Sequence, residues 1–302
     1  MPIEVPIVDC EAADAAAQLR GACMSVGFFY LTNHGIRPDL EAAVYDEMHR
    51  FFQQPLEEKN KVLANANMRG YTPMSEETLD PAVQTQGDTK EGYYICRAAQ
   101  PDELHLPLHG ANIFPDAKFE ATTTAYFDAM TTLGFRVARL FADAAGTPDA
   151  FDAPGMFDRP MAALRLLHYS DRVSDVSSGI FGAGAHSDYG LLTLLSTDNT
   201  PGLEIYVEQQ WVPVPPKPGC FIVNIGDLGE RWTNGLFKST RHRVVNRVGR
   251  ERYSIPFFYE PNFTCVVKCL PSCVGSGAKY APITSGEHLM AKYAETHDSY
   301  KL

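Results

Sequence analysis

The spacing of apolar residues divides the chain into a helical first half and a strand-rich second half. Apolar residues recur at helical spacing over 11–26, 39–52 and 117–145, which predicts three helices. A short β-prone run at 3–8 precedes them. The stripe along the longest predicted helix, which we expect to be core packing, consists of Phe119, Tyr126, Met130, Leu133, Val137 and Leu140.

Beyond Pro160 the pattern changes to short β-prone runs separated by Gly, Pro, Asp and Asn. The predicted strands are 161–169, 190–196, 202–207, 220–225, 242–246 and 253–259. Many short strands with turn signals between them are typical of a sandwich, a barrel or a jelly roll. A final helix is expected near 286–296, because Thr284 and Glu287 have the spacing of a capping box at its start.

The chain shows no internal repeat, low-complexity tract or linker that would mark a domain boundary. We therefore expect one domain over 1–302 that is mainly β with flanking helices. A mixed helical part is expected over 1–155, a β-rich core over 156–283 and a C-terminal helix over 284–302.

The segment 70–112 is rich in Gly, Pro, Thr, Asp and Gln, and a short aromatic run at 92–96 interrupts it. Composition of this kind predicts a long irregular connection. Long loops in compact proteins often act as lids over a binding site. We therefore expect Tyr71, Thr72 and Tyr93 to cover a substrate.

Composition and charge narrow the choice of partner. The formal charge is −11, which argues against nucleic acid or an anionic membrane as the main partner, because Lys and Arg dominate binding to both. The apolar stretches are shorter than the ~20 residues that span a bilayer, and the N-terminus does not resemble a secretory signal. The seven cysteines are odd in number and scattered, which favours a reducing cytoplasm. A small-molecule substrate fits this composition.

The most informative chemical feature is the pair His186 and Asp188, two residues apart at a predicted strand or strand end. Side chains at such spacing in an extended chain point to the same side. His242 begins another β-prone run, so two neighbouring strands could supply two imidazoles and one carboxylate. This set of ligands, with the remaining metal positions open, is the one that activates O₂ at non-haem Fe(II).

Arg252 and Ser254 form a second pair at the same spacing, ten residues beyond His242. A guanidinium fork and a hydroxyl on one strand face make a carboxylate clamp. Fe(II) and Asp188 together keep one positive charge, which a 2-oxoglutarate dianion would reverse and Arg252 would cancel. A buried site with balanced charge avoids the high cost of an unpaired ion. The alternative for Arg252 is a solvated charge near 247–252.

These motifs and their order closely resemble the isopenicillin N synthase-like family of 2-oxoglutarate/Fe(II) oxygenases. The resemblance covers nearly the whole chain and implies a double-stranded β-helix, a distorted jelly roll flanked by helices. The segments that carry it, besides the motifs around His186, His242 and Arg252, are 27–36, 87–95, 202–206, 219–235 and 256–262.

The resemblance also implies an activity: oxidation of a small organic molecule with Fe(II), 2-oxoglutarate and O₂, most simply hydroxylation, with release of succinate and CO₂. It assigns the iron to His186, Asp188 and His242. It assigns the far carboxylate of 2-oxoglutarate to Arg252 and Ser254.

Further positions that match the family have weaker assignments. Tyr169 matches a tyrosine that hydrogen-bonds the co-substrate, with an ordinary core tyrosine as the alternative. Phe258 and Glu260 match positions that line substrate pockets in related enzymes. The chain departs from the family at Leu167, where many plant members have an asparagine that contacts the co-substrate.

Three other functions remain open from the sequence. Some family members keep the Arg-x-Ser pair but act as Fe(II) oxidases without 2-oxoglutarate. A zinc hydrolase could use two His and a carboxylate, although it would not require Arg252 and Ser254. A non-catalytic binding module on the same jelly roll is the third, because a fold alone does not establish activity.

Overall fold

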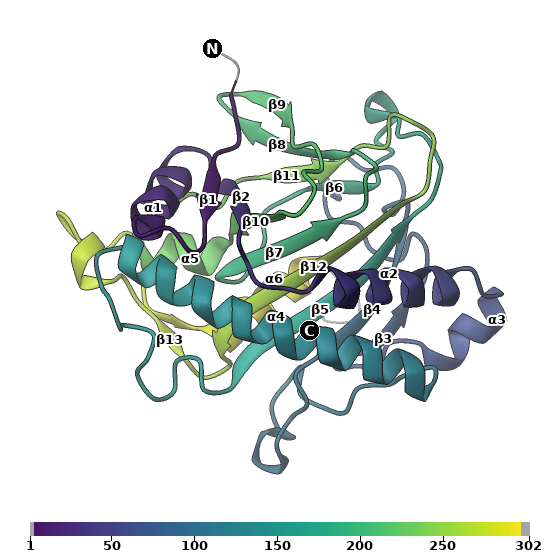
Figure 1. The fold of residues 1–302 in the computed structure, drawn as a ribbon, viewed down its shortest axis with the longest axis horizontal. Coiled ribbons are helices and arrows are strands. Elements are labelled where there is room, and N and C mark those ends of the chain that lie inside the picture. The colour runs from purple at the N-terminus through teal and green to yellow at the C-terminus, as the bar shows by residue number, and fades with distance from the viewer. Residues whose placement is uncertain (1–2, 297–302) are drawn as a thin grey trace.

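Three long helices lie side by side on one face of the molecule (Figure 1). The computed structural model describes residues 3–296, and in it these helices are α1 (Ala15–Ser25), α2 (Pro38–Phe52) and α4 (Ala117–Ala144). Helix α4 packs against α1, α2 and strand β12. The helices predicted from apolar spacing are therefore confirmed, with ends that shift by a few residues.

The remaining helices are α6, which follows the last strand, and several shorter helices and turns. Thr284 and Glu287 form the expected capping box at the start of α6: each side chain accepts a hydrogen bond from the backbone N–H of the other. The part of the C-terminal helix predicted beyond 296 lies outside the described residues. These elements are α3 (Leu56–Lys59), α5 (Asp227–Trp232), α6 (Ser285–Thr296) and the 3₁₀ turns η1 (Asn60–Val62), η2 (Pro101–Glu103), η3 (Val176–Ser178) and η4 (Pro271–Cys273).

The larger of the two main sheets has eight strands in the order β1-β2-β10-β7-β12-β5-β4-β3. It contains strands from both the N-terminal part and the β-rich core, so the two parts share one hydrogen-bonded sheet. The strands are β1 (Ile7–Asp9), β2 (Phe28–Thr32), β3 (Gly70–Thr72), β4 (Lys90–Cys96), β5 (Pro160–Tyr169), β7 (Leu192–Thr197), β10 (Phe221–Ile225) and β12 (Arg252–Asn262).

The smaller sheet has the order β6-β11-β8-β9 and lies above strands β7 and β12 of the large sheet in Figure 1. Its strands are β6 (Ala183–His186), β8 (Leu203–Val207), β9 (Gln210–Pro213) and β11 (His242–Val244), and a separate pair is formed by β13 (Val266–Val267) and β14 (Ile283–Thr284). The fold is mainly β, and the two sheets together form the expected distorted jelly roll. Among residues 3–296, no helix combines the length and apolarity that crossing a membrane requires.

Several elements differ from the sequence prediction. The first strand covers 7–9 and not 3–8, and strands β2 and β9 and helix α5 were not predicted. Strand β2 reads as a continuation of the preceding helical pattern, but Gly27 separates them. Gly27 has a φ of 73°, and a Cβ there would lie 2.3 Å from the Lys238 carbonyl oxygen. The segment 70–112 is also less irregular than expected, because β3 and β4 pair within it.

The main hydrophobic core lies between the helices and the large sheet. Helix α4 approaches β12 closely at Gly134, where a Cβ would lie 2.7 Å from the ring of Tyr259. The opposite face of the large sheet is turned toward the small sheet, and the polar residues described below gather between the two. The helices therefore cover one face of the large sheet, and the other face carries the polar residues of the candidate site.

Candidate functional site

His186, Asp188 and His242 come together at the join of two neighbouring strands. Strand β11 pairs with β6 in a register that places His242 opposite His186, and Asp188 follows the end of β6 by two residues. The Nε2 atoms of His186 and His242 lie 3.8 and 3.6 Å from Asp188 Oδ1. One ligand atom from each residue lies within 4.8 Å of the other two. The geometry is that of one metal site.

Backbone carbonyls orient both imidazoles. His186 Nδ1 donates to the Gly184 carbonyl at 2.8 Å, and His242 Nδ1 donates to the Thr240 carbonyl at 3.2 Å. Because the protons sit on Nδ1, each Nε2 keeps its lone pair and faces the shared point. Hydrogen bonds of this kind commonly fix the tautomer of metal-binding histidines.

Asp188 is fixed in the same way from the large sheet. Its Oδ2 accepts from Thr193 Oγ1 on β7 at 2.5 Å and from Asn224 Nδ2 on β10 at 2.7 Å. Its Oδ1 is the oxygen that faces the two histidines. The carboxylate is therefore oriented to offer one oxygen to a metal.

The protonation states also suit a metal. Burial, and then the neighbouring His242, lower the pKa of His186 to about 4. Burial alone would raise the pKa of Asp188, but the two histidines and the hydrogen bonds from Thr193 and Asn224 outweigh it and lower this pKa. Neutral imidazoles and an ionised carboxylate are the forms that bind a cation. This donor set fits Fe(II).

Arg252, Ser254 and Tyr169 lie in a narrow cavity that the metal group also lines. The Arg252 guanidinium donates from Nη1 to Ser254 Oγ at 3.1 Å and lies over the Tyr169 ring, 4.9 Å from its centre. Arg252 is 3% exposed, its Nε is buried without a hydrogen-bond partner, and it forms no ion pair with any residue in the described range 3–296. An unpaired buried guanidinium calls for an anionic ligand. Leu167 lines the same cavity with an apolar side chain.

A second, larger cavity borders the metal group and shares His186 and Asp188 with the first. Phe258 borders both cavities, and Glu260 lines only the larger one. Burial, and then the charge of Asp188, raise the pKa of Glu260 to about 8. Strand β12 thus carries the clamp residues at one end and cavity-lining residues at the other.

Tyr71 and Tyr93 do not lie where the sequence analysis expected them. They are 1% and 0% exposed and belong to the main hydrophobic core, where both rings contact Phe51. The Tyr71 hydroxyl donates to Glu91 Oε2 at 2.5 Å. Thr72 lines a separate surface hollow.

Residues just before this segment and within it line the larger cavity instead. They are Met68 and Arg69 before β3 and Tyr94 on β4. Tyr93 and Tyr94 point to opposite sides of their strand, so the choice between them depends on which face of β4 meets the core. The run of consecutive aromatic residues at 92–96 carries no alternation that could reveal this.

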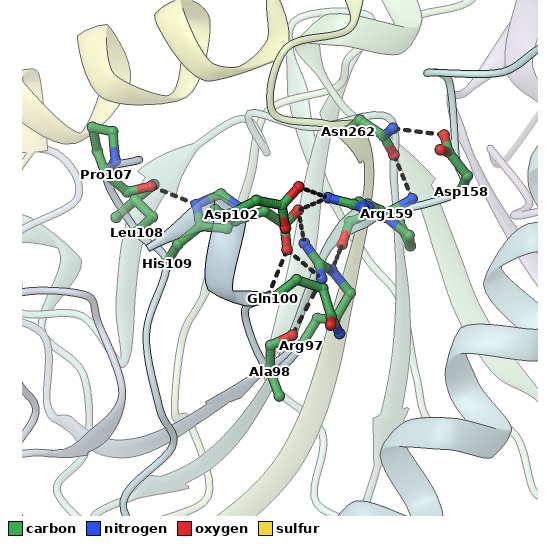
Figure 2. Close-up of polar contacts among 12 residues, drawn as sticks. Arg97, Ala98, Gln100, Asp102, Pro107, Leu108, His109, Asp158, Arg159 and Asn262 are labelled. Atoms are coloured by element: carbon green, nitrogen blue, oxygen red, sulfur yellow. Dashed lines mark hydrogen bonds and ion pairs between the residues drawn. The ribbon is translucent and has the colours of Figure 1, made fainter. Parts of the chain in front are cut away.

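Within the expected lid segment 70–112, residues 97–109 close one wall of the larger cavity with Arg97, Leu108 and His109, which the sequence analysis did not single out. Figure 2 shows how ion pairs hold this segment. The guanidinium of Arg97 forms a two-pronged pair with Glu103, at 2.9 and 2.7 Å. Arg159, at the start of β5, pairs with Asp102 at 2.7 Å. The charged residues of this segment were the only sign in the sequence that it is held in place by ion pairs.

Comparisons with known proteins agree with this geometry. Residues 5–117 match the family model described as non-haem dioxygenase in morphine synthesis N-terminal, and residues 161–261 match the 2OG-Fe(II) oxygenase superfamily. The second match contains all three residues of the metal group, Arg252 and Glu260.

Characterised relatives and solved structures cover almost the whole chain. Kihadalactone A synthase LFS of Citrus sinensis is 34% identical over 97% of this chain and 93% of its own. The 2-oxoglutarate-Fe(II) type oxidoreductase hxnY of Emericella nidulans is 35% identical over 99% and 93%. A full-length Neurospora crassa protein, crystallised in complex with alpha-KG, has a TM-score of 0.83 at 31% identity, with 96% of each chain covered. A second structure of that Neurospora crassa protein holds thymine as well as alpha-KG.

The fold, the His-Asp-His group and the relatives agree with one another. This chain belongs to the 2-oxoglutarate/Fe(II)-dependent dioxygenase family and is an oxidoreductase that uses Fe(II), 2-oxoglutarate and O₂.

Proposed function

We propose that His186, Asp188 and His242 hold the Fe(II), and that Arg252 with Ser254 binds the far carboxylate of 2-oxoglutarate. The observation that carries this proposal is one cavity lined by both groups, in which Arg252 is buried without an ion-pair partner among residues 3–296. A dianionic co-substrate would supply the missing negative charge. Tyr169, whose ring lies beside Arg252, would form a wall of the same subsite.

Bound together, Fe(II) and 2-oxoglutarate supply the oxidising power: O₂ is consumed, 2-oxoglutarate becomes succinate and CO₂, and a C–H bond of the substrate becomes C–OH. We propose hydroxylation as this chain's reaction. The protein's contribution is placement. The Asp188 carboxylate stays fixed by Thr193 and Asn224, and Leu167 and Phe258 keep apolar surface around the co-substrate cavity.

The substrate we propose is a small organic molecule in the larger cavity, in contact with Phe258 and Glu260. The cavity reaches the metal group through His186 and Asp188, so a molecule in it would lie beside the iron. The Neurospora crassa protein that holds thymine is a structural neighbour with a small organic molecule bound. The charge of −11 argues against nucleic acid or an anionic membrane as a partner.

We further propose a cytoplasmic location. All seven cysteines are free thiols in the structure, and a reducing compartment keeps them so. Non-reducing mass spectrometry of the protein isolated under acid quench should find seven thiols. A disulfide in freshly isolated protein would contradict this location.

The proposal is tested by anaerobic reconstitution with Fe(II) and 2-oxoglutarate, followed by visible spectroscopy. We expect the weak charge-transfer absorption of chelated 2-oxoglutarate in the wild type. The band should vanish in His186→Ala, which removes a ligand, and in Arg252→Leu, which removes the clamp. Arg250→Leu is the matched control, because it removes an exposed guanidinium from the same turn.

Two results would contradict the assignment of these residues. A band that survives Arg252→Leu would place the co-substrate carboxylate elsewhere. Iron that binds normally to His186→Ala would remove the metal assignment.

A further inference from the structure

Glu260 is a carboxyl group in the larger cavity that has no partner among the residues the structure describes. It lies on β12, is 8% exposed and lines the cavity beside the metal group. Its carboxyl forms no hydrogen bond or ion pair with any of residues 3–296. Buried carboxyl groups are nearly always paired, so one left free toward a cavity indicates a ligand.

The chain makes room for this carboxyl next to the iron-binding loop. Gly190 lies two residues after Asp188, and a Cβ there would come within 2.2 Å of Glu260 Cγ and 2.5 Å of Oε1. Any larger residue at 190 would displace the side chain. The loop that contains Asp188 therefore also contacts the Glu260 side chain through Gly190.

The other cationic side chains that line the cavity are hydrogen-bonded by the protein, although Arg69 Nε and Arg165 Nε are buried without a partner. Arg97 forms its two-pronged pair with Glu103, and Arg165 pairs with Glu77 at 2.9 Å. Arg69 donates to the carbonyl oxygens of Asn67, Leu108 and Arg97, so it ties together the loops of the cavity wall. Among the carboxyl groups that line the cavity, Glu260 is the one that forms no ion pair with a described residue.

We propose that Glu260 binds a protonated nitrogen of the substrate, and that the substrate class of this enzyme is small organic amines or related cationic nitrogen compounds. This inference deepens the proposed function and rests on it. A cation would favour the ionised form of this buried, unpaired carboxyl, because the attraction between the two charges offsets part of the cost of removing them from water.

Two further observations favour a cation. The cavity wall contains several aromatic side chains, whose faces attract cations. The formal charge of −11 favours the approach of positively charged small molecules. The aromatic residues in the wall are Tyr94, Tyr189, Phe258 and Tyr293.

The position of Glu260 also determines where the substrate would be oxidised. Residues 252, 254, 256, 258 and 260 alternate along one face of β12. The first four line the co-substrate cavity, and the last two line the larger one. An amine held at Glu260 would therefore place its neighbouring carbons between Phe258 and the metal group.

The test uses the full-length enzyme loaded with Fe(II) and 2-oxoglutarate, and three pairs of compounds that differ only in amine against hydroxyl. The pairs are benzylamine and benzyl alcohol, tyramine and tyrosol, and tryptamine and tryptophol, and thymine serves as a neutral N–H compound. Succinate formation above the compound-free rate is measured for each. We expect at least one amine to exceed its alcohol at least tenfold in the wild type.

The variant Glu260→Gln keeps the shape and hydrogen-bonding capacity of the side chain but removes its charge. We expect it to lower the ratio of the amine response to the alcohol response at least tenfold. Glu120→Gln, an exposed glutamate on α4, is the matched control and should behave as the wild type. If the Gln variant fails to fold, the amine-to-alcohol ratio of the wild type decides alone.

Contrary outcomes are distinct. Amines that are no better than alcohols, a preference that survives Glu260→Gln, or a response to thymine alone would each overturn the proposal. The charge-transfer band of 2-oxoglutarate separates these results from failure of the proposed function: the band stays in Glu260→Gln if only the substrate assignment is wrong. Its absence in the wild type would remove the proposed function itself.

Discussion

The two oxygens of the Asp188 carboxylate have different surroundings. Oδ1 faces the two histidines, whereas Oδ2 is held by Thr193 and Asn224. These two hydrogen bonds reduce the entropy that would be lost when a metal fixes the carboxylate. They also keep Oδ2 occupied, so that the carboxylate offers one oxygen and leaves metal positions open.

We predict that Asn224→Leu, which is similar in size but donates no hydrogen bond, weakens Fe(II) binding about 10- to 100-fold. Anaerobic titration with Fe(II), or with Co(II) followed by its visible absorption, measures this directly. Thr193→Val should act in the same direction. Unchanged metal affinity in both variants would show that the orientation of Asp188 is set by the backbone alone.

A lysine in place of Arg252 should bind 2-oxoglutarate less well. Arg offers a planar fork that matches a carboxylate, whereas Lys offers a single point charge. We predict that Arg252→Lys raises the KM for 2-oxoglutarate about tenfold, which corresponds to about 1.4 kcal/mol of binding. Initial rates of succinate release at varied 2-oxoglutarate give the value, with Arg250→Lys as the control. An unchanged KM would move the clamp away from Arg252.

The residues that the sequence revealed and those that it hid differ in a physical way. Unusual chemistry at short, regular spacing marks a set of residues that the structure brings together around one cavity: His186, Asp188, His242, Arg252 and Ser254. The residues that orient Asp188 lie in runs that read as ordinary strands, and their role depends on which strands become neighbours. Sequence spacing does not contain that information.

At the scale of elements, α4 is the helix whose start is best defined. The Asp116 carboxylate accepts hydrogen bonds from the backbone N–H groups of Lys118 and Phe119, and it also pairs with Arg50 on α2. These bonds satisfy backbone donors that the helix cannot pair internally. The same residue thus begins α4 and fastens it to α2.

We predict that Asp116→Ala lowers the free energy of unfolding by about 1 kcal/mol, the usual cost of losing a cap. The backbone hydrogen bond from Phe119, and then Arg50, hold the pKa of Asp116 below its ordinary value despite a small opposing effect of burial. The added stability is therefore present above the carboxyl's unfolded pKa and is lost as the pH falls through its folded pKa. Urea unfolding at neutral and acidic pH measures both effects.

Asp116→Asn provides the matched control, because asparagine caps helices without charge. Its stability should lie between those of Asp116→Ala and the wild type at neutral pH. The gap to the wild type should narrow on acidification. A gap that is constant with pH would show that the ionised carboxylate contributes nothing beyond its geometry.

The prediction of helices and strands succeeded where an apolar pattern extended over several turns. It failed where pairing with distant strands determines the secondary structure. The three long helices each carry an apolar stripe over several turns, which is a strong local signal. Strand β2 is short and buried at four of its five positions, so it lacks the alternation of a half-exposed strand. Its identity as a strand comes from pairing with β1 and β10, which lie at separate places in the sequence.

At the scale of the molecule, the eight-stranded sheet joins the helical N-terminal part to the jelly roll. Strand β2 pairs with β10 and strand β4 pairs with β5, so neither part has a complete sheet alone. The metal group and the clamp are supplied by β6, β11 and β12 of the jelly roll. One wall of the larger cavity comes from the N-terminal part. The complete site therefore requires both parts.

We propose that the two parts form one cooperative unit, and we predict a single thermal transition in calorimetry. Fe(II) and 2-oxoglutarate bind only the folded chain, so at about 100 times the dissociation constant they should add about 2.7 kcal/mol of stability. For a chain of this size that corresponds to a rise in Tm of about 5 °C. The whole transition should move, because the ligands contact strands that are continuous with the N-terminal sheet.

His186→Ala should show the same single transition without the ligand-dependent rise, which separates the binding effect from any general effect of the additives. Two transitions, of which only one responds to Fe(II) and 2-oxoglutarate, would mean that the N-terminal part unfolds independently and that the shared sheet does not couple the parts. The same result would predict that the wall formed by 97–109 can detach while iron remains bound. Cooperativity therefore tests whether the substrate cavity and the metal site are stabilised together.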